Sequence, residues 1–449
     1  MLKSQKREWS TLDTIRKISP DWEIKNLLRY AVKEKNSFVN GPFGSDLLTS
    51  ELTDHGVPVI YIRDISQGRY LRKSTVCVKK QKADSLPACR TLRFDVLIYK
   101  VGDPPCESAV YDRPEDAIVT QDVIKIRTGS KQISQFLVQL LNSDIGKRQI
   151  KKIKIRGTRD RVSLTDFKRI KLPYPPLKEQ KKIAQILSTW DKTIETVGKL
   201  IEHSKAQKKA LMQQLLTGPG GKNWKSATLK SLADSNSKNS FIDGDWVESP
   251  HIKTSGFRLI QTGNIGVGLF ENANKRYISE ESFKDLKCKE VCVGDLLIGR
   301  LAEPAGRSCI VPNLGEKKMI TSVDVTLFRP DKQKVDAYFL IQYLNHPHML
   351  FLIESLCGGS TRTRVSRSNL GKLKIPLPSL MEQKEIAKIL ENSNRYIENL
   401  EKQKTNLIIQ KKSLMQQLLT GKRRVKLDQP AAETTKKTKQ QPTPKTATG

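Results

Sequence analysis

The sequence predicts a duplicated mixed α/β fold, in which two similar domains are each followed by one long helix. The segment LMQQLLTG at 211–218 recurs letter for letter at 414–421, a shift of 203 residues. The segments that begin at Phe136 and Glu179 recur at the same shift, at Phe339 and Glu382. A repeat of this kind is a structural unit, and a period of about 200 residues is far longer than that of a solenoid. The chain is therefore predicted to be a pseudo-dimer with an internal pseudo-two-fold repeat.

Short apolar runs bounded by turn residues open each copy, and this pattern is typical of strands. Runs at 59–65, 94–98 and 118–123 correspond to runs at 259–265, 294–298 and 319–325. Helical segments at about 133–150 and 336–356 follow, and then a basic loop, a short strand and a Pro-rich boundary. We expect mixed α/β domains over 1–176 and 219–379.

Each copy ends in an apolar stripe that steps 4, 3, 4, 3, from 183 to 215 and from 386 to 418. This 3.5-residue repeat with charged flanks indicates a coiled coil. We expect helices over 177–218 and 380–421 that pair with each other, although a helix buried in its own domain gives the same stripe. The Thr-Gly ends fit a glycine helix stop. The residues that define the stripe are Ile183, Leu187, Trp190, Ile194, Leu211 and Leu215, then Ile386, Leu390, Ile397, Leu400, Leu414 and Leu418. Apolar residues beside the stripe, such as Met212 and Ile389, imply further partners.

The charge balance favours a polyanionic partner. Lys and Arg number 80 against 47 Asp and Glu, which gives a net charge of +33. Nucleic acid is the commonest such partner, and an ordinary basic protein with solvated charges is the alternative. The tail 422–449 is also basic, and we expect it to be disordered. There is no 18-residue apolar run and no apolar signal-peptide core. We therefore expect a cytoplasmic protein with no membrane association.

No segment of the sequence predicts an active site. Residues 102–106, GDPPC, imitate methyltransferase loops, but no glycine-rich cofactor loop accompanies them and the second copy reads AEPAG. We expect no catalysis by Cys106. The seven cysteines are scattered and are expected to be reduced structural thiols. His346 and His348 alone make a weak metal site, and the letters of a nuclease site at 20–25 lack a third carboxylate.

The densest charge lies between Lys147 and Lys171, where eleven basic residues face two acidic ones. Its centre, RGTRDRVS at 156–163, aligns with GSTRTRVS at 359–366. Arginines suit phosphate or guanine, hydroxyls reach phosphates, and glycine lets the backbone approach DNA. A solvated loop without a partner is the alternative. Recurrence in both copies of a basic chain favours double-stranded DNA as the partner.

These segments together resemble one family, the specificity subunits of type I restriction–modification systems. The paired helices with the Pro-x-Pro-x-Leu-x-Glu-Gln-Lys start and the LMQQLLTG end carry the resemblance. The segments NGPFGS at 40–45, IYIRDI at 60–65, GDLLI at 294–298 and GDPP at 102–105 add to it. The resemblance implies two target-recognition domains, each reading half of a split DNA sequence. Two antiparallel coiled-coil helices would separate them as a spacer ruler.

The resemblance also implies partners and site residues. Two modification subunits with S-adenosylmethionine and two restriction subunits with ATP and Mg would dock, and the chain itself would be non-catalytic and bind no cofactor. A type IIB-like recognition subunit, a methyltransferase using 102–106, and a coiled-coil scaffold with incidental charge are the alternatives. The DNA contacts that we predict are Gly41, Phe43, Ser45, Arg63, Lys100, Arg156, Thr158, Arg159, Arg161, Arg300, Thr361, Arg362, Arg364 and Arg367.

Overall fold

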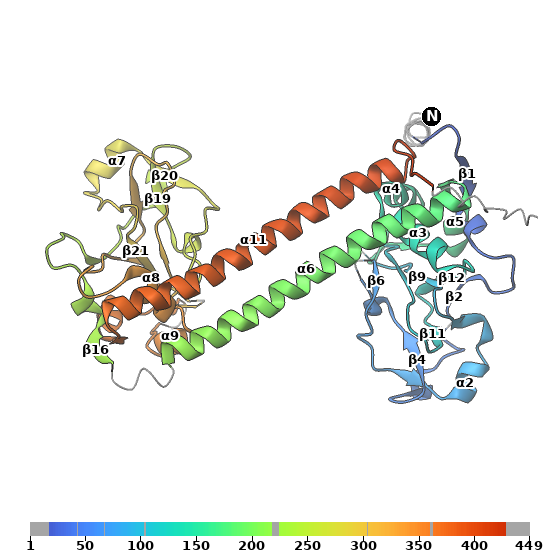
Figure 1. The fold of residues 1–449 in the computed structure, drawn as a ribbon, viewed down its shortest axis with the longest axis horizontal. Coiled ribbons are helices and arrows are strands. Elements are labelled where there is room, and N and C mark those ends of the chain that lie inside the picture. The colour runs from blue at the N-terminus through green and yellow to red at the C-terminus, as the bar shows by residue number, and fades with distance from the viewer. Residues whose placement is uncertain are drawn as a thin grey trace, which may run out of the picture. The chain divides into compact units, whose positions relative to one another are not determined.

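The computed structural model describes residues 18–427 apart from 43, 67, 103–104, 218–223, 303 and 360–361. The chain divides into two compact units, Met1–Thr196 with Lys404–Gly449, and Val197–Gln403. The boundaries fall inside the two long helices, α6 (Leu177–Thr217) and α11 (Leu380–Leu418). Each unit therefore contains part of both helices (Figure 1). Both helices lie within the ranges that the apolar stripes predict.

The described part of the first unit contains two larger sheets below a layer of helices. A six-stranded sheet has the order β2 (Phe38–Asn40), β12 (Val123–Ile126), β9 (Val96–Tyr99), β10 (Ser108–Val110), β6 (Arg69–Tyr70), β5 (Ile65–Ser66). A five-stranded sheet has the order β3 (Leu52–Thr53), β7 (Cys77–Val78), β4 (Val57–Ile60), β11 (Ala117–Val119), β8 (Arg90–Thr91). Two strand pairs are β1 (Glu23–Asn26) with β15 (Lys171–Tyr174), and β13 (Lys154–Ile155) with β14 (Arg161–Val162).

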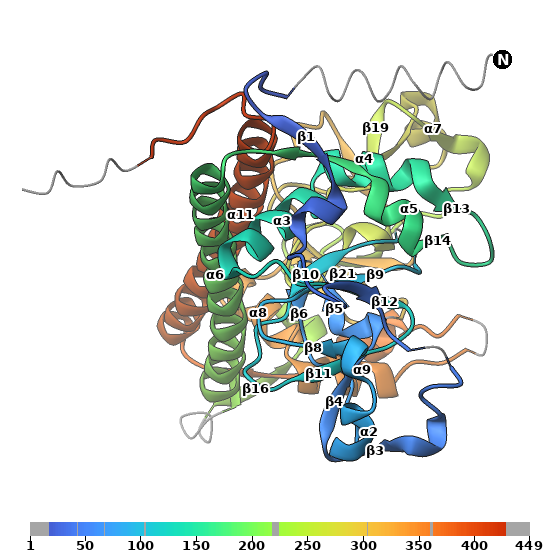
Figure 2. The ribbon, with the colours of Figure 1, turned by 90° about the vertical axis from the view of Figure 1, so that its right-hand side faces the viewer.

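Besides its parts of α6 and α11, the described part of the first unit contains the helices α2 (Lys80–Asp84), α3 (Lys131–Asn142), α4 (Asp144–Ile153) and α5 (Leu164–Arg169). In both ribbon views the six-stranded sheet lies between the α3–α5 layer and the five-stranded sheet (Figures 1 and 2). The expected helix at 133–150 is two helices, because Ser143 starts a new one by accepting from the N–H groups of Ile145 and Gly146.

The second unit repeats this plan with two sheets of four strands each in its described part. One has the order β17 (Phe241–Asp243), β24 (Val325–Phe328), β21 (Leu296–Gly299), β22 (Ser308–Ile310). The other has the order β18 (Ile252–Lys253), β20 (Arg276–Ile278), β19 (Phe257–Ile260), β23 (Met319–Thr321). The strands β16 (Lys225–Thr228) and β25 (Lys374–Leu377) pair, and the helices are α7 (Glu280–Asp285), α8 (Ala337–Leu344), α9 (Pro347–Ser355) and α10 (Arg367–Lys372).

The apolar stripes of α6 and α11 are covered as predicted. Every position of both stripes is buried or half-buried, including the twelve residues that define them, whereas most intervening residues are exposed. In the first unit, Ile183 and Leu187 share a core with Leu418 and Leu419, so the two helices run antiparallel there. In the second unit, Leu216 shares a core with Ile386 and Leu390. The heptad pattern therefore reports helix pairing and also packing against each domain.

The segment that follows α11 is ordered for longer than the sequence predicted. Gly421 has a φ of 71°, which confirms the glycine stop. Beyond it, Arg424 forms ion pairs with Glu179 at 2.5 Å and Asp21 at 2.8 Å. Val425 packs on the core of the first unit. Residues 422–427 thus belong to the first unit and not to a disordered tail, and residues 428–449 lie outside the described residues.

Candidate nucleic-acid interface

The arginine loop of the first unit connects β13 to β14 and is fixed to the end of β9. The Gly102 N–H donates to the Asp160 carbonyl at 3.0 Å, and the Val162 N–H donates to the Lys100 carbonyl at 3.0 Å. Inside the loop, Lys154 forms an ion pair with Asp160. These contacts hold the loop backbone in place while Arg156, Thr158 and Arg159 remain exposed. The side chains are therefore available to a partner on a supported loop.

Three other segments meet this loop and form a groove of about 760 Å³. The groove is lined by Tyr61, Ile62, Arg63, Val101, Gly102, Thr120, Gln121, Asp122, Gly157, Thr158, Arg159 and Asp160. These residues come from the segments after β4, β9 and β11 and from the arginine loop. The fold thus brings Arg63, Thr158 and Arg159, which are far apart in sequence, to one concave surface.

Arg63 is held in position although it is exposed. Its Nε donates to the Ser74 Oγ at 2.8 Å, and its guanidinium lies 5.1 Å from the centre of the Tyr61 ring. The turn that carries it, Ile62–Asp64, is fixed because Asp64 Oδ2 accepts from the Tyr61 N–H at 2.8 Å. A pre-oriented guanidinium loses less conformational entropy when it binds a phosphate or a base.

The second unit anchors its arginine loop in the same way. The Val365 N–H donates to the Arg300 carbonyl at 3.0 Å, and Gly358 and Arg364 exchange two backbone hydrogen bonds of 3.0 Å. Gly359 has a φ of 108°, and a Cβ there would lie 2.8 Å from the Arg362 carbonyl oxygen, so this position requires glycine. The Arg364 side chain is 3.5 Å from Asp324 and remains exposed, as Arg362 does.

The predicted contact residues fall into three groups. The exposed ones are Ser45, Arg63, Arg156, Thr158, Arg159, Arg161, Arg362, Arg364 and Arg367, and Lys100 is half-buried. Phe43 and Thr361 lie outside the described residues. Gly41 and Arg300 are buried. The surface group is the set that can meet DNA without rearrangement.

The two buried residues have structural roles that correct our expectation. Arg300 is only 6% exposed. Its Nη2 donates to the Val323 carbonyl at 2.6 Å, and its Nε lies 3.4 Å from Asp243. A Cβ at Gly41 would lie 2.2 Å from the Val119 carbonyl oxygen, so close backbone approach explains that glycine. Gly41 and the Arg300 side chain are both buried, and we leave both residues out of the proposed contact set.

Sequence reasoning missed Tyr61 and Gln121, which also line the groove of the first unit. Gln121 is exposed and lies two residues after the end of β11. A signal for it was present, because the Thr-x-Asp motif at 120–122 ends a strand that recurs in the second copy. Nothing in the sequence alone showed that this strand end faces the arginine loop.

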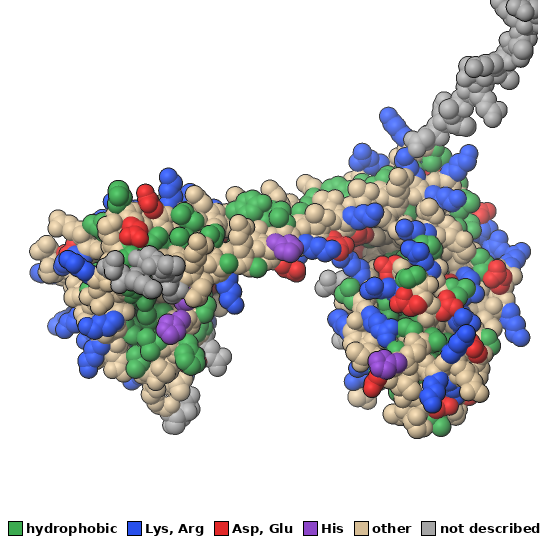
Figure 3. Space-filling view, turned by 60° about the horizontal axis from the view of Figure 1, so that its bottom comes forward, with side chains coloured by type: hydrophobic (Ala, Val, Ile, Leu, Met, Phe, Trp, Pro, Cys, Tyr) green, Lys and Arg blue, Asp and Glu red, His purple; other side chains and the backbone are tan. Residues whose placement is uncertain are grey.

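Outside these loops, Lys and Arg side chains are spread over the visible face of both units (Figure 3). By contrast, Cys106 is 2% exposed and burial raises its pKa to about 12, so its thiol stays protonated at neutral pH. A protonated, buried thiol is a poor nucleophile.

Asp21, which belongs to the nuclease-like segment at 20–25, forms an ion pair with Arg424. Among the described residues there is no cluster of three or more His, Cys, Asp or Glu suited to a metal ion. No described helix is long and apolar enough to cross a membrane.

Comparisons with known proteins identify the family to which the chain belongs. The family model of the type I restriction modification DNA specificity domain matches residues 48–203 and 221–410. A Methanocaldococcus jannaschii protein named as the MjaX type I restriction enzyme specificity subunit is 27% identical over 95% of this chain and 99% of its own length. The Escherichia coli type I restriction enzyme EcoBI specificity subunit is 24% identical over 81% of this chain and 78% of its own.

A solved structure has the same fold at low sequence identity. The type I restriction–modification S subunit from M. genitalium matches with a TM-score of 0.56 and 14% identity, over 90% of this chain and 98% of that one. The architecture is thus that of S subunits, with mixed α/β domains and long paired helices. The chain belongs to the type I restriction–modification DNA specificity family. It is a specificity subunit, and its role is DNA sequence recognition.

Proposed function

We propose that this subunit reads a bipartite, asymmetric DNA target, with one half-site for each unit. The observation that carries the proposal is the pair of arginine loops, each hydrogen-bonded to the segment after the equivalent strand, β9 or β21. The same support holds different side chains, because Arg156 and Asp160 of the first loop correspond to Gly359 and Thr363 of the second. Unlike readers on equivalent supports require unlike half-sites, since base contacts specify sequence and phosphate contacts only position the protein.

The contact set is exposed Arg63, Arg156, Thr158, Arg159 and Arg161 in the first unit, with Lys100 beside them. In the second unit it is Arg362, Arg364 and Arg367. Arginine is suited to bidentate contacts with guanine or phosphate. Ser45 and the segments at 43 and 361 add to the predicted interface.

The helices α6 and α11 would act as the spacer that fixes the distance between half-sites. Their antiparallel pairing is supported in each unit separately, by Lys411–Asp191 at 2.6 Å in the first and Lys205–Glu401 at 2.7 Å in the second. Long paired helices are stiff on this length scale, and linked readers recognise half-sites at a fixed spacing.

Partner subunits would supply the chemistry. We propose that the chain is non-catalytic and holds no cofactor, and that two modification and two restriction subunits bring S-adenosylmethionine, ATP and Mg. The apolar side chains that α11 leaves exposed support docking along this helix. They are Ile389, Tyr396, Ile408 and Ile409, which are 43%, 51%, 48% and 61% exposed.

The test is to lengthen α6 by four helical residues after Glu195 and to map N6-methyladenine across the host genome. Four residues add about 6 Å, which corresponds to about two base pairs. We expect both half-sites to be unchanged and the spacer to change. Deleting the gene identifies the motif that depends on this subunit, and a matched insertion after Glu398 in α11 tests the other helix. Altered half-sites, or an unaltered spacer in active variants, would contradict the ruler.

A further inference from the structure

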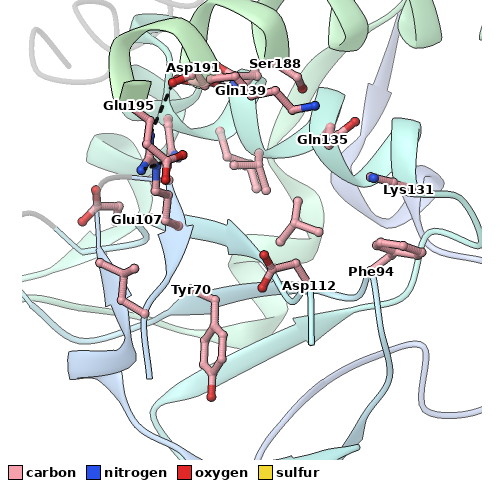
Figure 4. Close-up of a pocket in the computed structure, with 18 of the residues that line it drawn as sticks. Tyr70, Phe94, Glu107, Asp112, Lys131, Gln135, Gln139, Ser188, Asp191 and Glu195 are labelled. Atoms are coloured by element: carbon pink, nitrogen blue, oxygen red, sulfur yellow. Dashed lines mark hydrogen bonds and ion pairs between the residues drawn. The ribbon is translucent and has the colours of Figure 1, made fainter. Parts of the chain in front are cut away.

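A carboxylate joins three elements in the first unit. Asp191 of α6 accepts from the Lys411 Nζ of α11 at 2.6 Å and from the Gln139 Nε2 of α3 at 2.6 Å. Figure 4 shows Asp191 and Gln139 side by side at the edge of a pocket of about 860 Å³. Nearby, Asp144 accepts from the Gln416 Nε2 at 3.1 Å. Two acidic groups therefore satisfy the donors that α3 and α11 present here.

The second unit keeps the donors and loses both acids. At the repeat shift of 203, Lys411 corresponds to Lys208 and Gln139 corresponds to Gln342. Asp191, however, corresponds to Asn394, and Asp144 corresponds to Pro347. In the second unit, therefore, the ammonium and amide donors remain, whereas each carboxylate acceptor is replaced by a neutral residue.

The donors left in the second unit line a pocket of about 260 Å³. Its polar lining includes Lys208, Lys209, Gln342, Asn345, His346 and His348, and none of the described residues that line it is acidic. Lys208 has no hydrogen bond or ion pair among the described residues, and burial lowers its pKa. A half-buried ammonium without a counter-ion is costly, because desolvation is not offset by attraction or hydrogen bonding.

We propose that this pocket of the second unit binds a carboxylate group, which meets the charge of Lys208 as Asp191 meets that of Lys411 in the first unit. Lys208 would supply the charge and Gln342 an amide N–H, as Lys411 and Gln139 do for Asp191. The carboxylate comes from a small free anion or from an acidic side chain of a docked protein. The second source rests on the proposed function, and the first does not.

The direct experiment restores the internal carboxylate with Asn394→Asp in the full-length chain. Thermal unfolding is followed during titration with sodium acetate at constant ionic strength. We expect acetate to raise the Tm of the wild type, and Asn394→Asp to raise it without acetate by about 2–4 °C. Acetate should then have no further specific effect on that variant or on Lys208→Gln. Equal Tm values and equal acetate responses in wild type and Asn394→Asp would overturn the proposal.

Asp191→Asn is the matched control, since it should create the same unfilled site in the first unit and make that unit respond to acetate.

The two possible sources of the carboxylate are distinguished by measuring assembly with the modification subunit. If a partner carboxylate fills the pocket, Asn394→Asp and Lys208→Gln each weaken assembly at least tenfold, and acetate competes. If assembly is unchanged while the acetate response follows the prediction, the ligand is a free anion. If the proposed function were wrong and the subunit did not recognise DNA, the expected response to acetate would be unchanged.

Discussion

The turns at Ile62–Asp64 and Thr262–Asn264 have the same backbone course but opposite hydrogen-bond polarity. Asp64 accepts from three backbone N–H groups, those of Tyr61 at 2.8 Å, Lys73 at 2.8 Å and Ser74 at 2.7 Å. At the equivalent position, Asn264 accepts from one N–H and donates to two carbonyl oxygens, those of Glu271 at 2.8 Å and Ala273 at 2.7 Å.

This difference shows that the two units stabilise equivalent turns by different hydrogen bonds. Both side chains are buried, so neither can exchange a lost partner for water. In the first unit the chain after the turn presents N–H groups and needs an acceptor. In the second it presents carbonyl groups and needs a donor. Asp and Asn have the same shape, but only Asn can donate a hydrogen bond. Which of the two residues each copy needs is therefore set by the backbone groups around it.

The largest effect is expected from exchanging these two residues. Asn264→Asp places a carboxylate against two carbonyl oxygens, and Asp64→Asn points an amide at N–H groups. Each should lower the free energy of unfolding of its own unit by about 3 kcal/mol, because a buried group is left unsatisfied. Hydrogen exchange of the strands of each unit reports the loss. Asn236→Asp makes the same chemical change at an exposed site, and an equal cost there would refute the explanation.

Periodic and repeated patterns were the parts of this molecule that the sequence could predict. The stripes of α6 and α11 are local, and a 3.5-residue repeat directly defines the covered face. The arginine loops recur and are exposed as expected. The burial of Arg300 was not predictable, because it depends on Asp243 and Val323, which only the tertiary fold brings near. The contacts of Arg424 with Glu179 have the same origin.

A smaller and more specific effect is expected from the arginine loops. Arg159→Ala and Arg362→Ala should each weaken specific DNA binding by ~1–3 kcal/mol if the guanidinium is bidentate to a base. Each variant should relax specificity only in the half-site of its own unit. A phosphate contact would instead lower the salt slope by about one and spare specificity. Binding titrations on single-base variants of the target distinguish a base contact from a phosphate contact.

Lys284→Ala, on the exposed face of α7, is the control. Unchanged affinity and specificity in both loop variants would remove these loops from the interface.

The smallest effect concerns a buried lysine that only the first unit has. Lys125 on β12 is 1% exposed, and its Nζ donates to the carbonyl oxygens of Ala88 at 3.0 Å and Arg90 at 2.8 Å. The equivalent residue of β24 is Leu327, which is also buried. Burial, with a smaller contribution from the charge of Arg127, lowers the pKa of Lys125 to about 8.

The sign of the pH dependence follows from that lowered pKa. Lysine in an unfolded chain titrates near 10.4, so between about pH 8 and pH 10 the unfolded state binds more protons. The contribution of Lys125 to stability therefore rises with pH, by about 1–2 kcal/mol. Buried thiols such as Cys106, whose pKa burial raises to about 12, oppose it, because the unfolded chain releases their protons first. The difference between wild type and Lys125→Met, followed by hydrogen exchange in the first unit, isolates the lysine. Leu327→Met should give no such pH-dependent difference, and a flat difference for Lys125→Met would mean that Lys125 keeps its charge throughout.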